Sequence, residues 1–206
     1  LKVDCIYRRL DDSFLDPKVF NKDSLIGVPG LFKCWLKKNV GILNAIGTGV
    51  ADDKVVYSYV NKMITYYLGE QPLLNQVETY LCHEEDQKKY VLENLSKLVV
   101  KPANASGGYG LMIGPKAPKK EIEEVRQKIL KNPREFIAQP LEVLSTGPTI
   151  TNNNIEPRHV DLRPFVLTGK SNYVTSGGLT RVALRKGSTI VNSSQGGGSK
   201  DTLSVG

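Results

Sequence analysis

Histidine, cysteine and long apolar runs are scarce in this chain of 206 residues, and each shortage excludes a kind of site or partner. The two histidines, His83 and His159, are too few for a histidine-based metal site. The three cysteines are scattered, with no Cys-x-x-Cys pair, which is typical of reduced structural thiols in a cytoplasmic protein. No apolar run is long enough to cross a bilayer, so we expect no membrane partner.

The start of the chain lacks both an initiator methionine and a secretion signal. Leu1-Lys-Val-Asp4 does not have the features of a signal peptide, which agrees with a cytoplasmic location. The missing methionine suggests a fragment or a processed chain. If the chain is the C-terminal portion of a longer protein, as the resemblance described below implies, the missing N-terminal half is its partner.

Two familiar phosphate-binding patterns are also absent. The dinucleotide pattern places glycines at its first, third and sixth positions and opens a helix, whereas Gly107, Gly108 and Gly110 lead into the apolar run Leu111-Met-Ile113. The Walker pattern ends in Gly-Lys-Ser/Thr, and Gly198-Ser-Lys-Asp201 does not. What remains is a glycine loop between two strands, the arrangement by which the glycine-rich loop of kinases covers phosphates.

The stretch from Leu98 to Ile113 is typical of two short apolar strands joined by that loop. Glycine lets the backbone approach a ligand closely, and free N–H groups in such a loop can bind phosphate. Lys101, at the end of the first strand, is a point charge able to reach phosphate oxygens. The alternative is an ordinary hairpin with a solvated lysine, and the loop by itself favours that alternative.

The net charge of +7 and a pI near 9.2 favour an anionic ligand, either a nucleotide or a nucleic acid. No basic run is interleaved with aromatic residues, as a binder of single strands needs. Gly107-Gly-Tyr-Gly110 has the Gly-x-x-Gly spacing of an RNA-binding KH loop, but that loop joins two helices and this one is flanked by strand-like runs. We therefore favour a nucleotide over a nucleic acid as the ligand.

Two further stretches could form a site. Asn44 to Lys54 links a short strand to a helix. Its exposed backbone amides could form a second anion site, and the alternative is that the segment only connects the two elements. Arg158 to Leu167 alternates as a strand, with His159, Asp161 and Arg163 on one face. Three ionisable side chains in a row need water, partners or a ligand, so we expect them to line a crevice.

The rest of the pattern predicts helices alternating with short strands. Residues 119–130 carry the apolar stripe of a helix, and residues 136–139 form a strand after it. We expect a polar loop at 145–154, and Pro164 marks an edge or a bulge in the strand 158–167. A strand is expected at 189–192, with a flexible linker after Asn192. A functional role for Asn192 is the alternative for that last segment.

Taken together, these stretches resemble the circularly permuted ATP-grasp family of bacterial proteins, and more distantly glutathionylspermidine synthase. The resemblance runs nearly end to end. It implies an α/β (α+β) fold of two lobes with mainly antiparallel sheets, in permuted order and incomplete at the N-terminus. Residues 1–82 would be part of the core lobe, 83–140 the small nucleotide-covering lobe, and 141–206 the antiparallel-sheet core. The resemblance is carried by Ile6-Tyr-Arg-Arg9, Gly47-Thr-Gly-Val-Ala-Asp-Asp-Lys54, Val99 to Gly110, Phe136-Ile-Ala-Gln-Pro140, Arg158 to Phe165, Gly177-Gly-Leu-Thr-Arg181 and Val191 to Asp201.

The resemblance also implies an activity and a set of site residues. ATP with Mg²⁺ would convert a small or peptide-like carboxylate into an acyl phosphate, which an amine or a thiol then attacks. The residues take these roles by position: Lys101, Ser106, Gly107, Gly108 and Gly110 at the phosphates, Gln139 at the adenine, Arg163, Arg181 and Asn192 at the transferred phosphate, Arg8 and Lys54 at the acceptor pocket, and Asp161 with Asn192 at the metal.

One feature departs from the family. ATP-grasp enzymes usually bind magnesium through a Glu-x-Asn strand, but Ile190 stands two positions before Asn192. We expect that strand before Leu1, so that residues 1–206 alone bind ATP weakly and catalyse nothing. A nucleotide-binding module without catalysis is the alternative to a ligase, and RNA binding is the weaker third alternative.

Overall fold

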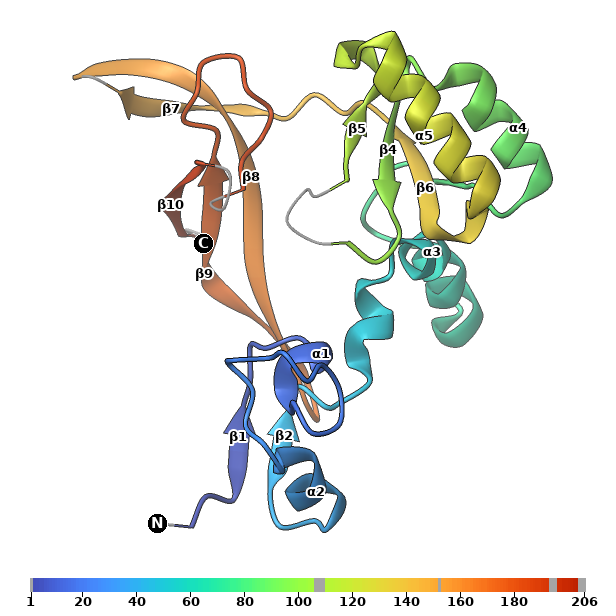
Figure 1. Cartoon of the computed structure of the whole chain (residues 1–206). Helices are drawn as coiled ribbons and strands as arrows, with labels where there is room; N and C mark the ends of the chain where they lie inside the picture. The colour runs from blue at the N-terminus through green and yellow to red at the C-terminus, as the bar shows by residue number, and fades with distance from the viewer. Residues whose placement is uncertain (1, 106–109, 152, 193–195, 204–206) are drawn as a thin grey trace.

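The computed structural model describes residues 2–105, 110–151, 153–192 and 196–203, and arranges them around three sheets (Figure 1). The first sheet is a parallel pair, β1 (Cys5–Tyr7) and β2 (Gly41–Leu43), which lies beside the short helices α1 (Asp12–Leu15) and α2 (Leu31–Leu36). We call residues 2–53 the N-terminal unit. Its path is fixed by Asp16, whose fully buried carboxylate accepts backbone N–H bonds from Lys18, Gly30 and Phe32.

A single capped helix connects this unit to the next lobe. After the turn η1 (Thr48–Asp52), Asp53 caps α3 (Lys54–Leu68) by accepting a bond from the N–H of Val55. Gly69 ends the helix in the left-handed region at φ 67°. Val55 packs with Leu81, Ala103 and Ile137 of the following lobe. The start of α3 therefore belongs to that lobe's core.

The second sheet forms the glycine-loop lobe, in the strand order β3 (Tyr80–Leu81), β6 (Phe136–Pro140), β4 (Leu98–Pro102) and β5 (Met112–Ile113). Helices α4 (Glu85–Asn94) and α5 (Lys119–Lys131) lie side by side on one face of this sheet (Figure 1), and the turns η2 (Gly114–Lys116) and η3 (Pro133–Glu135) flank α5. The predicted hairpin is confirmed, because β4 and β5 pair antiparallel. The core consists of apolar residues, chiefly Val91, Leu95, Leu98, Val100, Met112, Val125 and Ile129.

Gly114 is where the hairpin passes closest to the backbone after α4. A Cβ at this position would lie 1.9 Å from the carbonyl oxygen of Leu95 and 2.6 Å from that of Leu98. Since backbone atoms cannot yield as a flexible side chain can, we expect Gly114→Ala to lower the free energy of unfolding by about 3 kcal/mol, the upper range for overpacking. Gly169→Ala, whose Cβ would meet nothing nearer than 3.9 Å, is the matched control in urea unfolding. Equal midpoints for the two variants would contradict this packing.

The third sheet is antiparallel and runs β10 (Gly198–Leu203), β9 (Asn172–Val182), β8 (Asn154–Thr168) and β7 (Thr146–Thr151). It corrects three predictions. Residues 146–151, predicted as a loop, pair with β8, and residues 198–203, predicted as linker, pair with β9. Residues 189–192, predicted as a strand, are irregular. A register shift between Pro164 and Val166 confirms the predicted bulge.

The predicted α/β class with mainly antiparallel sheets is confirmed. The division at residues 82 and 140 stays a prediction. Among the residues that the structure describes, no helix combines the length and the apolarity needed to cross a membrane.

Candidate functional site

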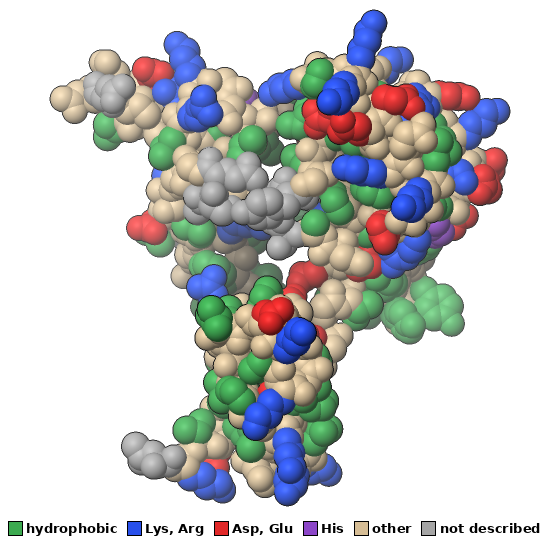
Figure 2. All heavy atoms as spheres, viewed as in Figure 1, with side chains coloured by type: hydrophobic (Ala, Val, Ile, Leu, Met, Phe, Trp, Pro, Cys, Tyr) green, Lys and Arg blue, Asp and Glu red, His purple; other side chains and the backbone are tan. Residues whose placement is uncertain are grey.

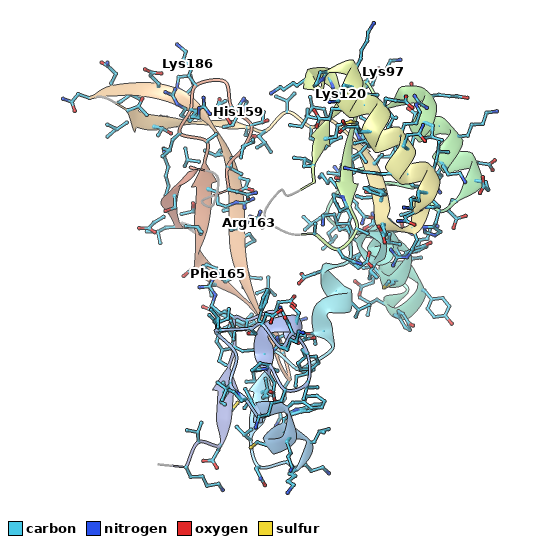
Figure 3. All side chains as sticks on the ribbon, viewed as in Figure 1. Lys97, Lys120, His159, Arg163, Phe165 and Lys186 are labelled. Carbon is cyan, nitrogen blue, oxygen red and sulfur yellow. The ribbon has the colours of Figure 1, made fainter. Side chains whose placement is uncertain are left out.

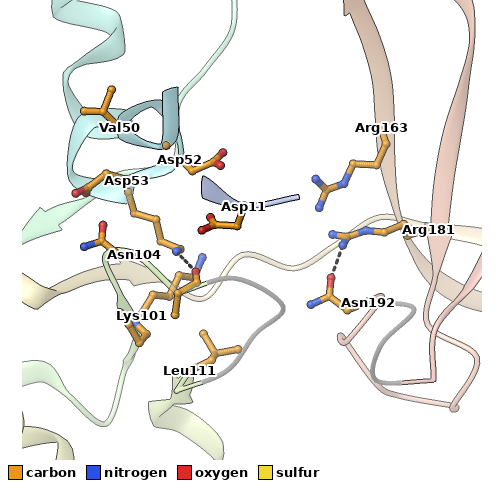
Figure 4. Close-up of a pocket in the computed structure, with 14 residues that line it drawn as sticks. Asp11, Val50, Asp52, Asp53, Lys101, Asn104, Leu111, Arg163, Arg181 and Asn192 are labelled. Atoms are coloured by element: carbon orange, nitrogen blue, oxygen red, sulfur yellow. Dashed lines mark hydrogen bonds between the residues drawn. The ribbon is translucent and has the colours of Figure 1, made fainter. Parts of the chain in front are cut away.

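A cavity of about 1000 Å³ lies between the N-terminal unit, the glycine-loop lobe and the third sheet (Figure 4). One wall carries Lys54 and Lys101, from the start of α3 and the end of β4. The opposite wall carries Arg163 of β8 and Arg181 of β9, which point toward the lysines across the cavity (Figure 4). The cavity is thus lined by cationic groups from segments far apart in the sequence.

The two lysines are held by different neighbours. The Nζ of Lys101 donates to the side-chain oxygen of Gln139 at 2.5 Å, and the Gln139 amide nitrogen donates to Thr79 at 2.8 Å. The Nζ of Lys54 donates to the carbonyl oxygen of Ala105 at 2.6 Å and to that of Ala103 at 3.4 Å. Lys54 therefore ties the start of α3 to the segment that enters the glycine loop.

Burial lowers the pKa of both lysines. Burial, and then the nearby positive charge of Lys54, lowers the pKa of Lys101. Burial also lowers the pKa of Lys54, although the carboxylates of Asp53 and Asp52 oppose that shift. An anion bound between these two half-buried lysines would raise their pKa values again, because a nearby negative charge favours the protonated form of each. This wall is suited to phosphate.

The opposite wall is an ion-pair network on one face of the third sheet. The register places Asp161 of β8 directly beside Arg181 of β9, and Arg181 donates to both carboxylate oxygens. Arg163 donates to Asp161 at 3.3 Å, and Arg181 also donates to the side-chain oxygen of Asn192. Burial alone would raise the pKa of Asp161, but the hydrogen bonds and charges of the two arginines outweigh it and hold the pKa below its usual value.

The predicted magnesium ligands do not fit a metal site. The Asp161 carboxylate accepts from two arginines and the Asn192 oxygen from one, whereas hard cations take several free oxygen ligands. Within residues 2–105, 110–151, 153–192 and 196–203, no three His, Cys, Asp or Glu side chains gather as a metal ion would require. Asp161 and Asn192 are better described as partners of Arg181.

A smaller cavity of about 330 Å³ adjoins the first, and the two share Lys101, Leu111, Arg181 and Asn192 in their walls. Gln139 lies in its lining, followed along the chain by Pro140 to Glu142. Most of its exposed wall is apolar, with contributions from Val99, Leu111, Ile113 and Ile190. A flat apolar group in this cavity would lie beside the Gln139 segment and extend toward the lysines.

The remaining predicted site residues lie as follows. Gly110, in the left-handed region at φ 72°, is described; Ser106, Gly107 and Gly108 lie outside the described residues. Arg8 is in the lining of neither cavity, and its place at the acceptor pocket stays a prediction. Its guanidinium donates to the backbone oxygens of Leu10, Asn44 and Ala45 and pairs with Asp12. Arg8 thus holds the segment 8–12 against the loop at residues 44–45.

The prediction missed the acidic part of the cavity lining. Asp11 and Asp52 reach into the cavity beside the lysines (Figure 4). Hydrogen bonds from Ser13 lower the pKa of Asp11, which keeps this carboxylate ionised. Asp53, also in the lining, is held by Arg134 at 2.8 Å. The available signal was that Asp11 and Asp52 lie in the segments that follow two strands of one sheet.

Comparison with known proteins gives the chain a family. The model of the family "circularly permuted ATP-grasp type 2" matches residues 1–183. An uncharacterized protein of Synechocystis sp. is 58% identical over 202 residues, which are 98% of this chain and 42% of the relative. An uncharacterized protein of Mycobacterium tuberculosis is 54% identical over 98% of this chain and 37% of its own length.

A third relative carries a functional name. The Frankia casuarinae protein named "Putative glutamate–cysteine ligase 2-2" is 51% identical over 98% of this chain and 23% of its own length. The chain thus spans less than half the length of each of these relatives. With a family model matched over residues 1–183, this chain belongs to the circularly permuted ATP-grasp family, type 2.

Proposed function

We propose that the two adjoining cavities bind ATP, with the adenine in the smaller cavity and the phosphates between Lys54 and Lys101. The proposal rests chiefly on this lysine pair, whose lowered pKa values and shared cavity favour a polyanion. The apolar walls of the smaller cavity, formed in part by Val99 and Leu111, suit a stacked base. Lys101 lies in both linings and marks where base and phosphates would join.

The position of Lys54 supports a role at the phosphates rather than at an acceptor pocket. Its ammonium is held by the carbonyl oxygens of Ala103 and Ala105, directly before the glycine loop, and its charge acts on Lys101. At this position the Lys54 ammonium would contact the same phosphate groups as Lys101. We therefore assign Lys54 to the nucleotide.

We further propose that the full-length protein is an ATP-dependent ligase. A substrate carboxylate oxygen attacks the γ-phosphorus, the bond to the β-phosphate oxygen breaks, and ADP leaves. The nitrogen of an amine, or a thiol sulfur, then attacks the acyl carbon; inorganic phosphate leaves and the nucleophile loses one proton. Arg163 and Arg181 face the phosphate side and would stabilise the charge on the transferred group.

The lining also suggests the character of the substrates. Arginine fits a carboxylate or phosphate with two parallel bonds, and Asp11 and Asp52 reach into the same cavity with negative charge. The carboxylate of an acid would pair with the arginines, and the ammonium form of an amine would pair with the aspartates. The name of the Frankia relative is consistent with ligation of a small amino acid or peptide.

The reaction is tested by measuring ADP and phosphate release from the full-length protein, given ATP, a divalent cation and panels of carboxylic acids and amines. The ligase proposal expects release that requires both an acid and an amine. Nucleotide binding without release under any combination would favour a non-catalytic module.

The pKa of Lys101 gives the proposed site a pH dependence. A lysine binds phosphate in its protonated form, and Lys101 loses its proton at a lower pH than an ordinary lysine because its pKa is lowered. We expect the affinity for a non-hydrolysable ATP analogue to fall as the pH rises from about 7 to about 10. Lys101→Arg, which stays charged, should flatten this fall. Identical pH profiles for the two proteins would exclude Lys101 as the titrating group.

A further inference from the structure

The parallel pair β1–β2 is an incomplete sheet within the residues that the structure describes. Its register pairs Cys5 with Gly41, Ile6 with Ile42 and Tyr7 with Leu43, and among the described residues no further strand pairs with them. Parallel sheets in proteins are buried on both faces and usually contain more strands, and a two-stranded sheet has little stability of its own. Both outer edges of this pair therefore present backbone groups that can pair with another strand.

The two faces of the pair differ sharply. Ile42, 4% exposed, is buried on the inner face. On the outer face Tyr7 is 72% exposed and Leu43 55% exposed, and Cys5 and Gly41 are exposed beside them. In Figure 2 the visible face of the N-terminal unit carries apolar side chains among lysines and arginines. A parallel pair with one apolar face exposed lacks the covering layer that parallel sheets have on both faces.

The length of the relatives indicates what covers this face. Residues equivalent to this chain make up 42% of the Synechocystis relative, so more than half of that polypeptide lies outside the matched region. That is enough chain to form the remaining strands and a covering helix layer of an α/β unit, whose crossover motifs take about 30 residues each. A segment of the same polypeptide needs no separate encounter to reach the open face.

The position of the pair relative to the cavity adds a functional consequence. The carboxyl ends of β1 and β2 lead to Asp11 and to η1 with Asp52, both of which line the large cavity. In parallel sheets, ligands bind at the carboxyl ends of the strands. A strand added in parallel beside β1 or β2 would direct its own carboxyl end toward the same cavity.

We propose that β1–β2 is the docking edge for an α/β segment of the full-length polypeptide, which adds a parallel strand and covers Tyr7 and Leu43 with apolar side chains. The added strand also brings new side chains to the Asp11 and Asp52 end of the cavity. This docking is a property of the fold and does not depend on the nature of the nucleotide or of the reaction.

Cys5 lies on the open face and reports its coverage directly. We expect N-ethylmaleimide to label Cys5 of the native full-length protein, without nucleotide, at least about tenfold more slowly than in guanidinium, where every thiol is open. Peptide mass spectrometry separates Cys5 from Cys34 and Cys82. Native labelling of Cys5 as fast as in guanidinium would overturn the proposal, because the structure of this chain leaves that cysteine exposed.

A pair of tyrosine variants provides the second measurement. Tyr7→Lys places a charge on the covered face and should lower the melting temperature of the full-length protein by several degrees. Tyr66→Lys is the control, since Tyr66 is 82% exposed on α3, outside the N-terminal unit. Equal melting temperatures for the two variants would count against docking on this face.

Discussion

Replacing Lys101 by alanine weakens the binding of a non-hydrolysable ATP analogue about 10- to 150-fold, the loss expected for one hydrogen bond to a charged group. The ammonium of Lys101 lies where the two cavities meet, and its described partner is the side-chain oxygen of Gln139. Alanine removes this charge from the centre of the proposed phosphate site. Lys54 remains, so binding should weaken rather than disappear. Calorimetric titration of the full-length protein measures the effect.

Lys97→Ala is the matched control for this experiment. Lys97 is exposed one residue before β4, away from both cavity linings (Figure 3). Its loss removes the same net charge from the same lobe, so a long-range effect of net charge would weaken binding in both variants. Equal affinities for Lys101→Ala and the wild type would exclude Lys101 from the phosphate site.

Replacing Arg181 by alanine should reduce ADP formation by about 100- to 1000-fold, as removal of one donor to a developing charge does in other enzymes. Arg181 is the centre of the arginine wall, since it holds Asp161, contacts Asn192 and lines both cavities. Arg185→Ala is the control, because Arg185 is exposed just beyond β9 and lies in neither lining. Equal rates for the two variants would place the transferred phosphate elsewhere.

The same substitution should change stability in a pH-dependent way. The pKa of Asp161 is held down by Arg181 and Arg163, so its contribution to folding is present above the unfolded pKa and is lost as the pH falls through the folded pKa. Arg181→Ala should therefore lower the free energy of unfolding at neutral pH and lower it less in acid. Adding Asp161→Asn should recover part of the loss, because it removes a carboxylate that has lost one of its two arginine partners and keeps only Arg163. Additive effects of the two substitutions would show that this pair is not coupled.

The elements that could be predicted from the sequence are those with strong local patterns. The helix α5 has an apolar stripe, and the glycine hairpin has two apolar runs with a turn between them, so local pattern sufficed for both. The strands β7 and β10 were missed because they are polar: Thr146-Gly-Pro-Thr-Ile-Thr151 and Gly198-Ser-Lys-Asp-Thr-Leu203 resemble loops. Their strand structure comes from backbone pairing with β8 and β9, which no local pattern records.

The site shows the same limit. The positions of Lys101, Arg163 and Arg181 could be expected from the resemblance, and the structure brings all three into one cavity lining. The clamp made by Arg8 could not, because its partners Asn44 and Ala45 are 36 and 37 residues away. The same holds for the influence of Lys54 on Lys101, which depends on how α3 packs against β4.

The most direct test of the central claim is a crystal structure of the full-length protein with a non-hydrolysable ATP analogue. The account predicts phosphate oxygens within about 3 Å of the Nζ atoms of Lys54 and Lys101, the distance of a charged hydrogen bond. It also predicts the adenine against the Gln139 to Glu142 segment. An analogue bound outside these two cavities, or bound with its adenine between the lysines and the arginines, would contradict the account.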